Sequence, residues 1–224
     1  TTQTLRVILK AVKQINQTTK GPHRFQNRLN EKFSAKIGTY YDGEFKNEPN
    51  TDWSLAANRE WAAKIRQKWK KSAKDESVEI PLVVAGKEIF NGRRTKGIYD
   101  PSQIKSRVLV ARAAMANSKD VEKAVTTAAE DPDGWRQMPF RRRHMILSKA
   151  ANQLRRARGD LIGAAAANTG KLFTEADVEV SEAIDFTEYY PYSANAFFQM
   201  GHVQGRGKRV GMVIPPWNFP IAIP

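Results

Sequence analysis

Arg209-Val-Gly-Met-Val-Ile-Pro-Pro-Trp-Asn-Phe-Pro-Ile-Ala-Ile-Pro224 is the most informative stretch of this sequence. Residues 210–214 form a short apolar run without polar alternation, which predicts a strand buried on both faces of a parallel sheet. Pro215 and Pro216 cannot donate to a sheet ladder, so the chain is expected to leave the sheet there. The carboxyl end of a parallel strand borders the crevice where such folds bind ligands. Trp217 and Asn218 are therefore expected to point into a site, where Trp217 offers a flat wall and Asn218 an amide donor.

Residues 216–220 read Pro-Trp-Asn-Phe-Pro, which resembles the PWNFP signature of the aldehyde dehydrogenase superfamily. In that family the asparagine helps to form the oxyanion hole, and the residues just before it line the cleft for the nicotinamide cofactor. The resemblance therefore implies that Asn218 is a catalytic residue and that NAD is bound by Ile214, Pro215, Pro216 and Trp217. The alternative is a proline-bounded turn whose tryptophan and asparagine are purely structural.

Two further stretches resemble one branch of this superfamily, the L-glutamate γ-semialdehyde (1-pyrroline-5-carboxylate) dehydrogenases. The first is Gly170-Lys171 together with the run at 179–186. The second, at 47–61, resembles the connector that precedes the dehydrogenase module in bifunctional proline utilization A enzymes. The resemblance implies NAD-dependent oxidation of the semialdehyde to L-glutamate. It also implies that Glu182 lies close to this small aldehyde substrate and that Phe219 packs on its aliphatic carbons. For Glu182, a solvated acidic helix face is the alternative.

The resemblance covers roughly residues 45–224 and implies an α/β fold class. Helices and antiparallel strands would lead into the first strand of a Rossmann-like parallel sheet, as the N-terminal portion of an aldehyde dehydrogenase fold. We expect an N-terminal helical connector over 1–44 and an incomplete NAD-binding domain over 45–224. The family uses a cysteine nucleophile and a general-base glutamate downstream of the asparagine, and this sequence contains no Cys. The chain is therefore expected to be inactive alone, to belong with the remainder of a longer polypeptide, and to form a homo-oligomer.

The formal charge of +14 raises nucleic-acid binding as a rival function. The basic residues are scattered through 64–74, 141–143 and 155–158 without interleaved exposed aromatic residues, so no nucleic-acid partner is expected. A non-catalytic scaffold or oligomerisation module is the second rival. No apolar run reaches the ~18 residues of a membrane span, and no metal is expected because no His, Cys or paired carboxylates stand at metal-binding spacing. A cytoplasmic protein is expected.

Apolar residues at helical spacing predict helices at 1–20, 55–69, 118–130, 139–158, 160–168 and 174–190. The expected N-terminal caps are Asp52 or Ser54, Ser118 and Thr174. Pro191 is expected to kink or end the last helix. Strands are predicted over 80–85, 88–90 and 107–112, paired antiparallel, with turns at Gly86-Lys87 and Asn91-Gly92.

The same spacing predicts which helix faces are buried. The expected buried stripe of 118–130 consists of Val121, Ala124, Val125 and Ala128. In 139–158, Arg155 is expected to face water and His144 to be structural or exposed. The expected polar flank of 174–190 consists of Glu175, Glu179, Glu182 and Asp185.

Overall fold

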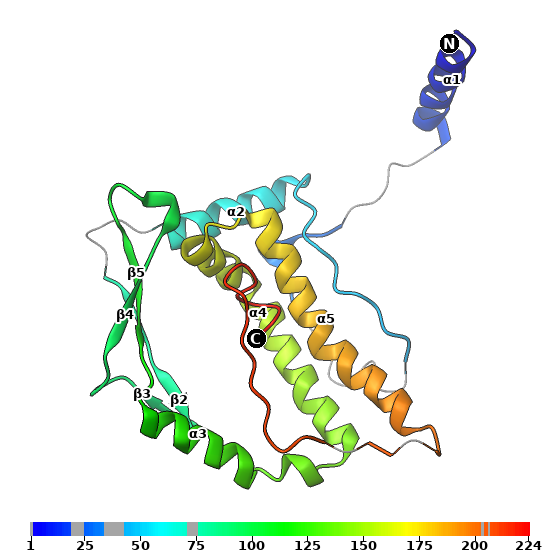
Figure 1. Ribbon diagram of the computed structural model, residues 1–224. Coiled ribbons are helices and arrows are strands. Elements are labelled where there is room, and N and C mark those ends of the chain that lie inside the picture. Colours follow the sequence, from blue (N-terminus) through cyan, green and yellow to red (C-terminus); the bar gives the residue numbers. More distant parts are fainter. Residues whose placement is uncertain (1, 19–24, 34–42, 71–75, 203, 206) are drawn as a thin grey trace.

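The computed structural model describes residues 2–18, 25–33, 43–70, 76–202, 204–205 and 207–224. Two long helices, α4 (Phe140–Thr169) and α5 (Phe173–Phe198), lie side by side and antiparallel, and a small twisted sheet stands opposite them (Figure 1). An apolar hollow between the layers is lined by residues of the sheet, by α4, and by Pro220 and Ile221. The end of the C-terminal segment therefore lies between the sheet and the helices.

The hydrophobic core lies mainly between α4 and α5. Gly170, at φ 72°, ends α4 in the left-handed conformation that glycine adopts freely, and the chain then reverses into α5. The buried cluster consists of Ala151, Ile162, Ala165, Ala176, Val180 and Ile184. Trp61 and Ile221 pack against this cluster from two distant parts of the chain. The helical pair is thus the framework on which the other segments are positioned.

The helices predicted at 139–158 and 160–168 are one continuous helix, α4. Gly159 and Gly163 face α2 (Ala56–Trp69), where a Cβ at Gly159 would lie 3.3 Å from Trp61 Cζ2. A Cβ at Gly163 would overlap the indole ring of Trp69. The two glycines allow α2 to pack closely on α4, and this tertiary contact outweighs their low helix propensity.

The predicted helices at 55–69 and 118–130 are confirmed, but their predicted caps are wrong. Leu55 precedes α2 and makes no side-chain cap, while Asp52 Oδ1 accepts hydrogen bonds from the Ser54 backbone at 3.1 Å and hydroxyl at 2.6 Å. Asp52 therefore shapes the turn before the helix. At α3 (Ser118–Glu130) the cap is Asn117, which exchanges two hydrogen bonds with Asp120. A capping box that begins one residue earlier than predicted satisfies two backbone N–H groups at the start of the helix.

The last predicted helix is longer than expected, and Thr174 is not its cap. α5 begins after Leu172, whose backbone N–H donates to Glu175 Oε2 at 3.0 Å. Pro191 does not end the helix, which continues to Phe198 with Pro191 buried inside it. The missing N–H of the proline weakens one turn but does not end the helix.

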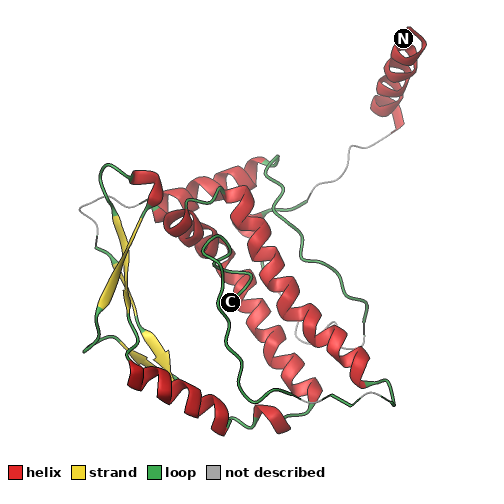
Figure 2. Ribbon diagram, viewed as in Figure 1, coloured by secondary structure: helices red, strands yellow, loops and turns green. Residues whose placement is uncertain are grey.

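The strands stand together on the side of the molecule opposite the two long helices (Figure 2). The three-stranded sheet has the spatial order β1 (Val78–Ile80), β5 (Leu109–Ala114) and β4 (Thr95–Tyr99). β4 is antiparallel to β5 but β1 is parallel to it, so the prediction of purely antiparallel strands is wrong. β2 (Leu82–Val84) and β3 (Lys87–Ile89) form a separate hairpin. Pro81 separates β1 from β2 because it has no N–H for a ladder. The sequence pattern does not predict β4, because Gly97 interrupts its apolar alternation.

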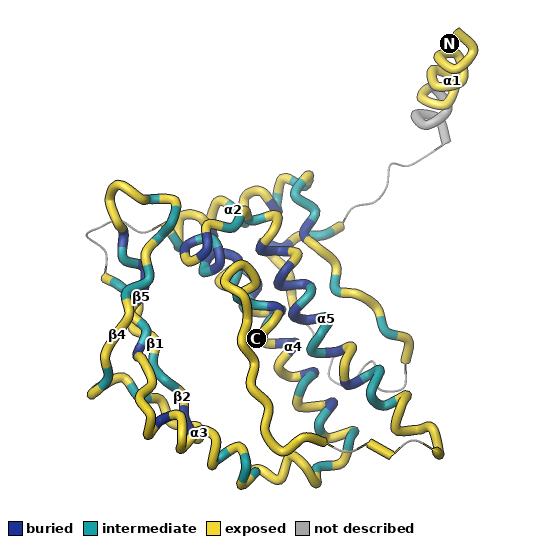
Figure 3. Tube along the Cα trace, in the orientation of Figure 1, coloured by how far each residue is buried: buried dark blue, intermediate teal, exposed yellow. Residues whose placement is uncertain are grey.

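The predicted buried stripe of α3 is exposed in the described structure. Val121 and Val125 are 54% and 51% exposed, and Ala124 and Ala128 are also exposed. The helix lies at the end of the sheet beside β2, and most of its residues are exposed (Figure 3). Helical spacing identifies the apolar face correctly but does not say what covers it.

Helix α1 (Thr2–Thr18) confirms the helix predicted at the start of the chain. The side chains described in it, at positions 2–12, are all exposed. Its expected end at Gly21-Pro22 lies outside the described residues. None of the described helices combines the length and the apolar character needed to cross a membrane.

The strand predicted at 210–214 is an extended, exposed segment instead (Figure 3). Met212 and Ile214 are 81% and 76% exposed. A strand is held by hydrogen bonds to its neighbours, and no strand among the described residues pairs with this segment. The apolar run therefore keeps an extended backbone without joining a sheet.

Candidate functional site

A tight turn presents the tryptophan and asparagine that the sequence singles out. The backbone N–H of Phe219 donates to the carbonyl of Pro216 at 3.2 Å, which places Trp217 and Asn218 at the two central positions. Pro215 and Pro216 restrict the backbone before the turn. Trp217 is 68% exposed, so its ring is accessible as a flat apolar surface.

This turn closes one side of a cleft of about 730 Å³. The other walls come from the end of α4, the connection that follows it, and the first turns of α5. Its lining residues are Thr169, Gly170, Lys171, Thr174, Glu175, Val178, Glu179, Glu182, Trp217, Asn218 and Phe219. The cleft thus brings together four residues that the sequence analysis names, Asn218, Trp217, Phe219 and Glu182. Ile214, Pro215 and Pro216 lie in the exposed segment that leads to the turn, and they do not line the cleft.

Glu182 also lines a second hollow, of about 540 Å³. This hollow is formed between α5 and the segment at 45–50, and it shares Val178 and Glu182 with the first cleft. Phe45, Phe186 and Tyr189 provide its aromatic lining. Glu182 therefore stands at the junction of two neighbouring hollows, partly buried.

The most buried acid beside the cleft, Glu179, is one that sequence reasoning misplaces. The prediction puts it on a polar flank, whereas the residue is 2% exposed. Its Oε2 accepts from Lys171 Nζ at 2.6 Å, and its Oε1 accepts from the backbone N–H groups of Ile221 at 2.7 Å and Ala222 at 3.1 Å. Lys171 Nζ also lies 4.6 Å from the centre of the Phe219 ring. The run of acids in the sequence gives no signal that separates Glu179 from Glu175, which is exposed, or from Glu182 and Asp185, which are half-buried.

A buried ion-pair network supports the same two helices. Arg158 Nη1 donates to Asp177 Oδ1 at 2.8 Å, and Arg155 Nε donates to Glu48 Oε2 at 2.8 Å. Arg155 is only 5% exposed, so the prediction that it faces water is wrong. The network offsets the cost of desolvating the charges, and removal of one partner from such a pair typically costs about 3–5 kcal/mol.

Burial and neighbouring charges shift the pKa values of the basic side chains in this network. It lowers the pKa of Arg158, and the positive charge of Arg28 adds to this, while Asp177 opposes it. Burial also lowers the pKa of Arg155, but the hydrogen bond and charge of Glu48 outweigh it and the net pKa is raised. His144, fully buried, has its pKa lowered by desolvation against the opposing effect of Glu188. Desolvation thus disfavours the charged form of His144, and its burial supports the structural alternative over the exposed one.

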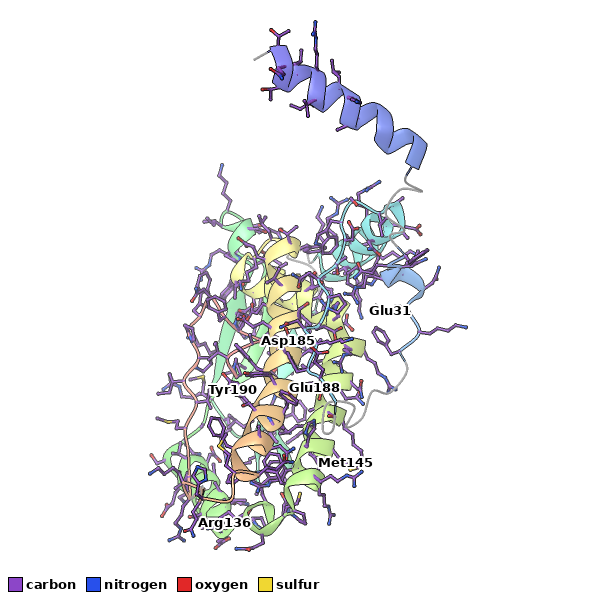
Figure 4. The ribbon with its side chains drawn as sticks, turned by 90° about the vertical axis from the view of Figure 1, so that its right-hand side faces the viewer. Glu31, Arg136, Met145, Asp185, Glu188 and Tyr190 are labelled. Carbon is purple, nitrogen blue, oxygen red and sulfur yellow. The ribbon has the colours of Figure 1, made fainter. Side chains whose placement is uncertain are left out.

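Acids on α5 fasten the segment at 45–51 along the helix. Asp177 accepts from the backbone and the hydroxyl of Thr51, both at 2.6 Å. Asp185 accepts from the backbone of Glu48 at 2.7 Å. Asp185 and Glu188 both lie along α5 (Figure 4). Because Glu182 lies between Asp177 and Asp185, this fastening also fixes one wall beside Glu182.

Arg28 connects the preceding segment to the same region. Its backbone N–H donates to Asn58 Oδ1 at 2.8 Å, and its Nη2 donates to the carbonyl of Pro49 at 2.7 Å.

Among the described residues, no three His, Cys, Asp or Glu side chains are grouped as a metal site would require. The boundary expected at residue 44 stays a prediction.

Comparison with known proteins identifies the family. A family model described as the aldehyde dehydrogenase family matches residues 91–224. The chain is 32% identical over 192 residues to a 1-pyrroline-5-carboxylate dehydrogenase of Staphylococcus aureus (strain MW2), covering 80% of this chain and 36% of that protein. It is 31% identical over 196 residues to the protein of the same name from Geobacillus kaustophilus, with the same coverage. The chain thus spans about a third of the length of these relatives.

Solved structures show the same relationship. Proline utilization A from Bdellovibrio bacteriovorus, inactivated by N-propargylglycine, matches with a TM-score of 0.71 and 31% identity, over 81% of this chain and 19% of that one. A Thermus 1-pyrroline-5-carboxylate dehydrogenase with bound NAD matches with a TM-score of 0.70 and 26% identity, over 81% and 36% of the two chains. These matches confirm the α/β fold class and the expected resemblance. The chain belongs to the aldehyde dehydrogenase family.

Proposed function

We propose that this chain forms part of an NAD-dependent aldehyde dehydrogenase that oxidises L-glutamate γ-semialdehyde to L-glutamate in proline catabolism. The observation that carries the proposal is the cleft in which Asn218, Phe219 and Glu182 meet. The names of the relatives support the substrate, and the NAD bound to the Thermus enzyme supports the cofactor. The expected cytoplasmic location and homo-oligomeric state stay predictions.

Asn218 is proposed to stabilise the charge that develops on the aldehyde oxygen. A nucleophile adds to the aldehyde carbon, the carbonyl electrons move onto oxygen, and the side-chain N–H of Asn218 donates to this oxyanion. Removal of one such donor typically costs about 2.7–4 kcal/mol of transition-state stabilisation. Because the sequence contains no Cys, the thiol nucleophile of the proposal comes from a part of the polypeptide outside these residues.

Two neighbours of Asn218 are proposed to select the substrate. The ring of Phe219 faces the cleft and suits the aliphatic carbons between the aldehyde and the amino-acid end. Glu182 is proposed to lie near the polar groups of the substrate, where a carboxylate accepts hydrogen bonds from an ammonium group.

The segment before the turn has the chemistry expected of a cofactor wall. Ile214 and Trp217 are exposed, apolar and separated only by the two prolines, so both side chains are available to pack on a flat ring. Bound NAD would supply the hydride acceptor. Ile214, Pro215, Pro216 and Trp217 would hold its ring beside Asn218, and their own contribution is to orient the ring and to exclude water.

The experiment is an activity assay on the natural polypeptide that contains these residues. NAD reduction is followed by absorbance with L-glutamate γ-semialdehyde, and with acetaldehyde as a comparison. We expect a kcat/KM at least tenfold higher for the semialdehyde, because only that substrate uses Phe219 and Glu182. Equal values for the two aldehydes would contradict the proposed substrate, and no NAD reduction with either would contradict the activity.

A further inference from the structure

Glu179 joins three parts of the chain through a single carboxylate. One oxygen accepts from the two backbone N–H groups of Ile221 and Ala222, and the other accepts from Lys171 Nζ. The side chain of Glu179 is 1% exposed. Both oxygens of this buried carboxylate accept hydrogen bonds, so the side chain is held in one orientation.

The donors lie just after the turn that presents Asn218. Ile221 packs on the core cluster and Ala222 is buried, whereas the chain up to and including Asn218, at 207–218, is exposed. The contacts that hold this segment to the helices therefore lie C-terminal to Asn218. Lys171 adds a second link, since its ammonium group contacts Glu179 and also lies over the Phe219 ring.

We propose that Glu179 is a positioning residue, which anchors the segment at 219–222 to α5 and thereby sets the place of Asn218 in the cleft. The catalytic meaning of this anchor rests on the proposed function, but the anchor itself does not. Glu179 acts through the backbone of Ile221 and Ala222 and touches no reacting atom. The competing explanation is that packing of Ile221 on the core holds the segment without help from the carboxylate.

Amide hydrogen exchange, measured by NMR on the 224-residue chain, separates the two explanations. In Glu179→Ala the amides of Ile221 and Ala222 lose a charged acceptor, and their exchange should accelerate about tenfold or more. The side-chain amide signals of Asn218 should also shift or broaden. Glu179→Gln keeps an oxygen acceptor without the charge, so it should restore part of the protection.

Glu188→Ala is the matched control. Glu188 is an equally buried acid of α5 that bonds to Ser148 and Arg155 and not to the C-terminal segment. It should leave the exchange of Ile221 and Ala222, relative to the slowest amides of α4, unchanged. If Glu179→Ala does not fold, the same comparison is made with Glu179→Gln, for which an exchange increase of severalfold at these two amides is expected.

Exchange rates of Ile221 and Ala222 within twofold of the wild type in the folded Glu179 variants would overturn the anchor. So would an equal acceleration in Glu188→Ala. None of these measurements needs substrate or turnover. A natural polypeptide without activity on the semialdehyde would therefore end the proposed function and leave the anchor standing.

Discussion

Asn218 occupies the corner of a turn whose approach is restricted by two prolines, and it lines the cleft. If its amide donates to an oxyanion, Asn218→Ala should reduce kcat of the natural polypeptide by about 100-fold or more, with little change in the KM for NAD. Steady-state kinetics measure both constants. Asn218→Asp keeps the shape but replaces the donor with a carboxylate oxygen, so it should be impaired at least as strongly. Wild-type turnover in either variant would exclude this role.

Glu182 offers a different test because it is expected to bind substrate and not to touch the reacting carbonyl. Glu182→Ala should raise the KM for the semialdehyde severalfold and change kcat less, since a binding contact is lost throughout the reaction. Glu122→Ala, on the exposed face of α3, is the control and should alter neither constant. An unchanged KM in Glu182→Ala would assign Glu182 to the solvated acidic face.

The helices are the elements that sequence predicts best, because an apolar stripe depends only on local spacing. The pairing of β1 with β5 could not be predicted in the same way, because it joins residues far apart in the chain. The apolar run at 210–214 has the composition of a buried strand, yet strand formation depends on a neighbour that local sequence does not specify. Composition shows that a segment is able to form a strand, but a neighbouring strand is needed for the strand to form.

In the candidate site too, local sequence predicts some residues and tertiary contacts determine the role of others. Asn218, Trp217 and Phe219 are adjacent in sequence, so one short pattern identifies all three. Glu179 and Glu182 are both acids on α5, and only the docking of the C-terminal segment makes the first a buried anchor and leaves the second facing the cleft. That distinction requires the distance between Glu179 and Ile221, which no local pattern contains.

The N-terminus of α3 carries a pH-sensitive contact. Hydrogen bonds from Arg93, and then from the backbone of Asn117, lower the pKa of Asp120 to about 2. An unfolded Asp titrates near 3.9, so the stabilisation of this helix end is complete above about pH 4 and is lost as the pH falls towards 2. An NMR titration of the Asp120 carboxyl carbon measures this pKa. The amide signals of α3, followed in the same titration, report the loss of the contact. A midpoint near 4, or an identical acid response in Asp120→Asn, would contradict the contact.

At the scale of the whole molecule, one of the basic clusters in the sequence is used partly inside the fold. Arg155 and Arg158 belong to one of the basic clusters in the sequence, but both are buried and paired with Glu48, Asp177 or Glu188. These arginines hold α4, α5 and the segment at 45–51 together. Two of the three arginines at 155–158 are therefore unavailable to the phosphates of a nucleic acid.

The whole chain also permits a prediction about its isolated activity. It contains a candidate oxyanion donor but no Cys, and covalent aldehyde oxidation in this proposal begins with attack by a thiolate. The purified 224-residue chain should therefore produce no NADH from the semialdehyde above the uncatalysed rate, whereas the natural polypeptide should. Iodoacetamide should abolish the activity of the natural polypeptide, because it alkylates the nucleophilic thiol. Sustained NADH production by the 224-residue chain, or full activity of the natural polypeptide after alkylation, would require a mechanism without a cysteine nucleophile.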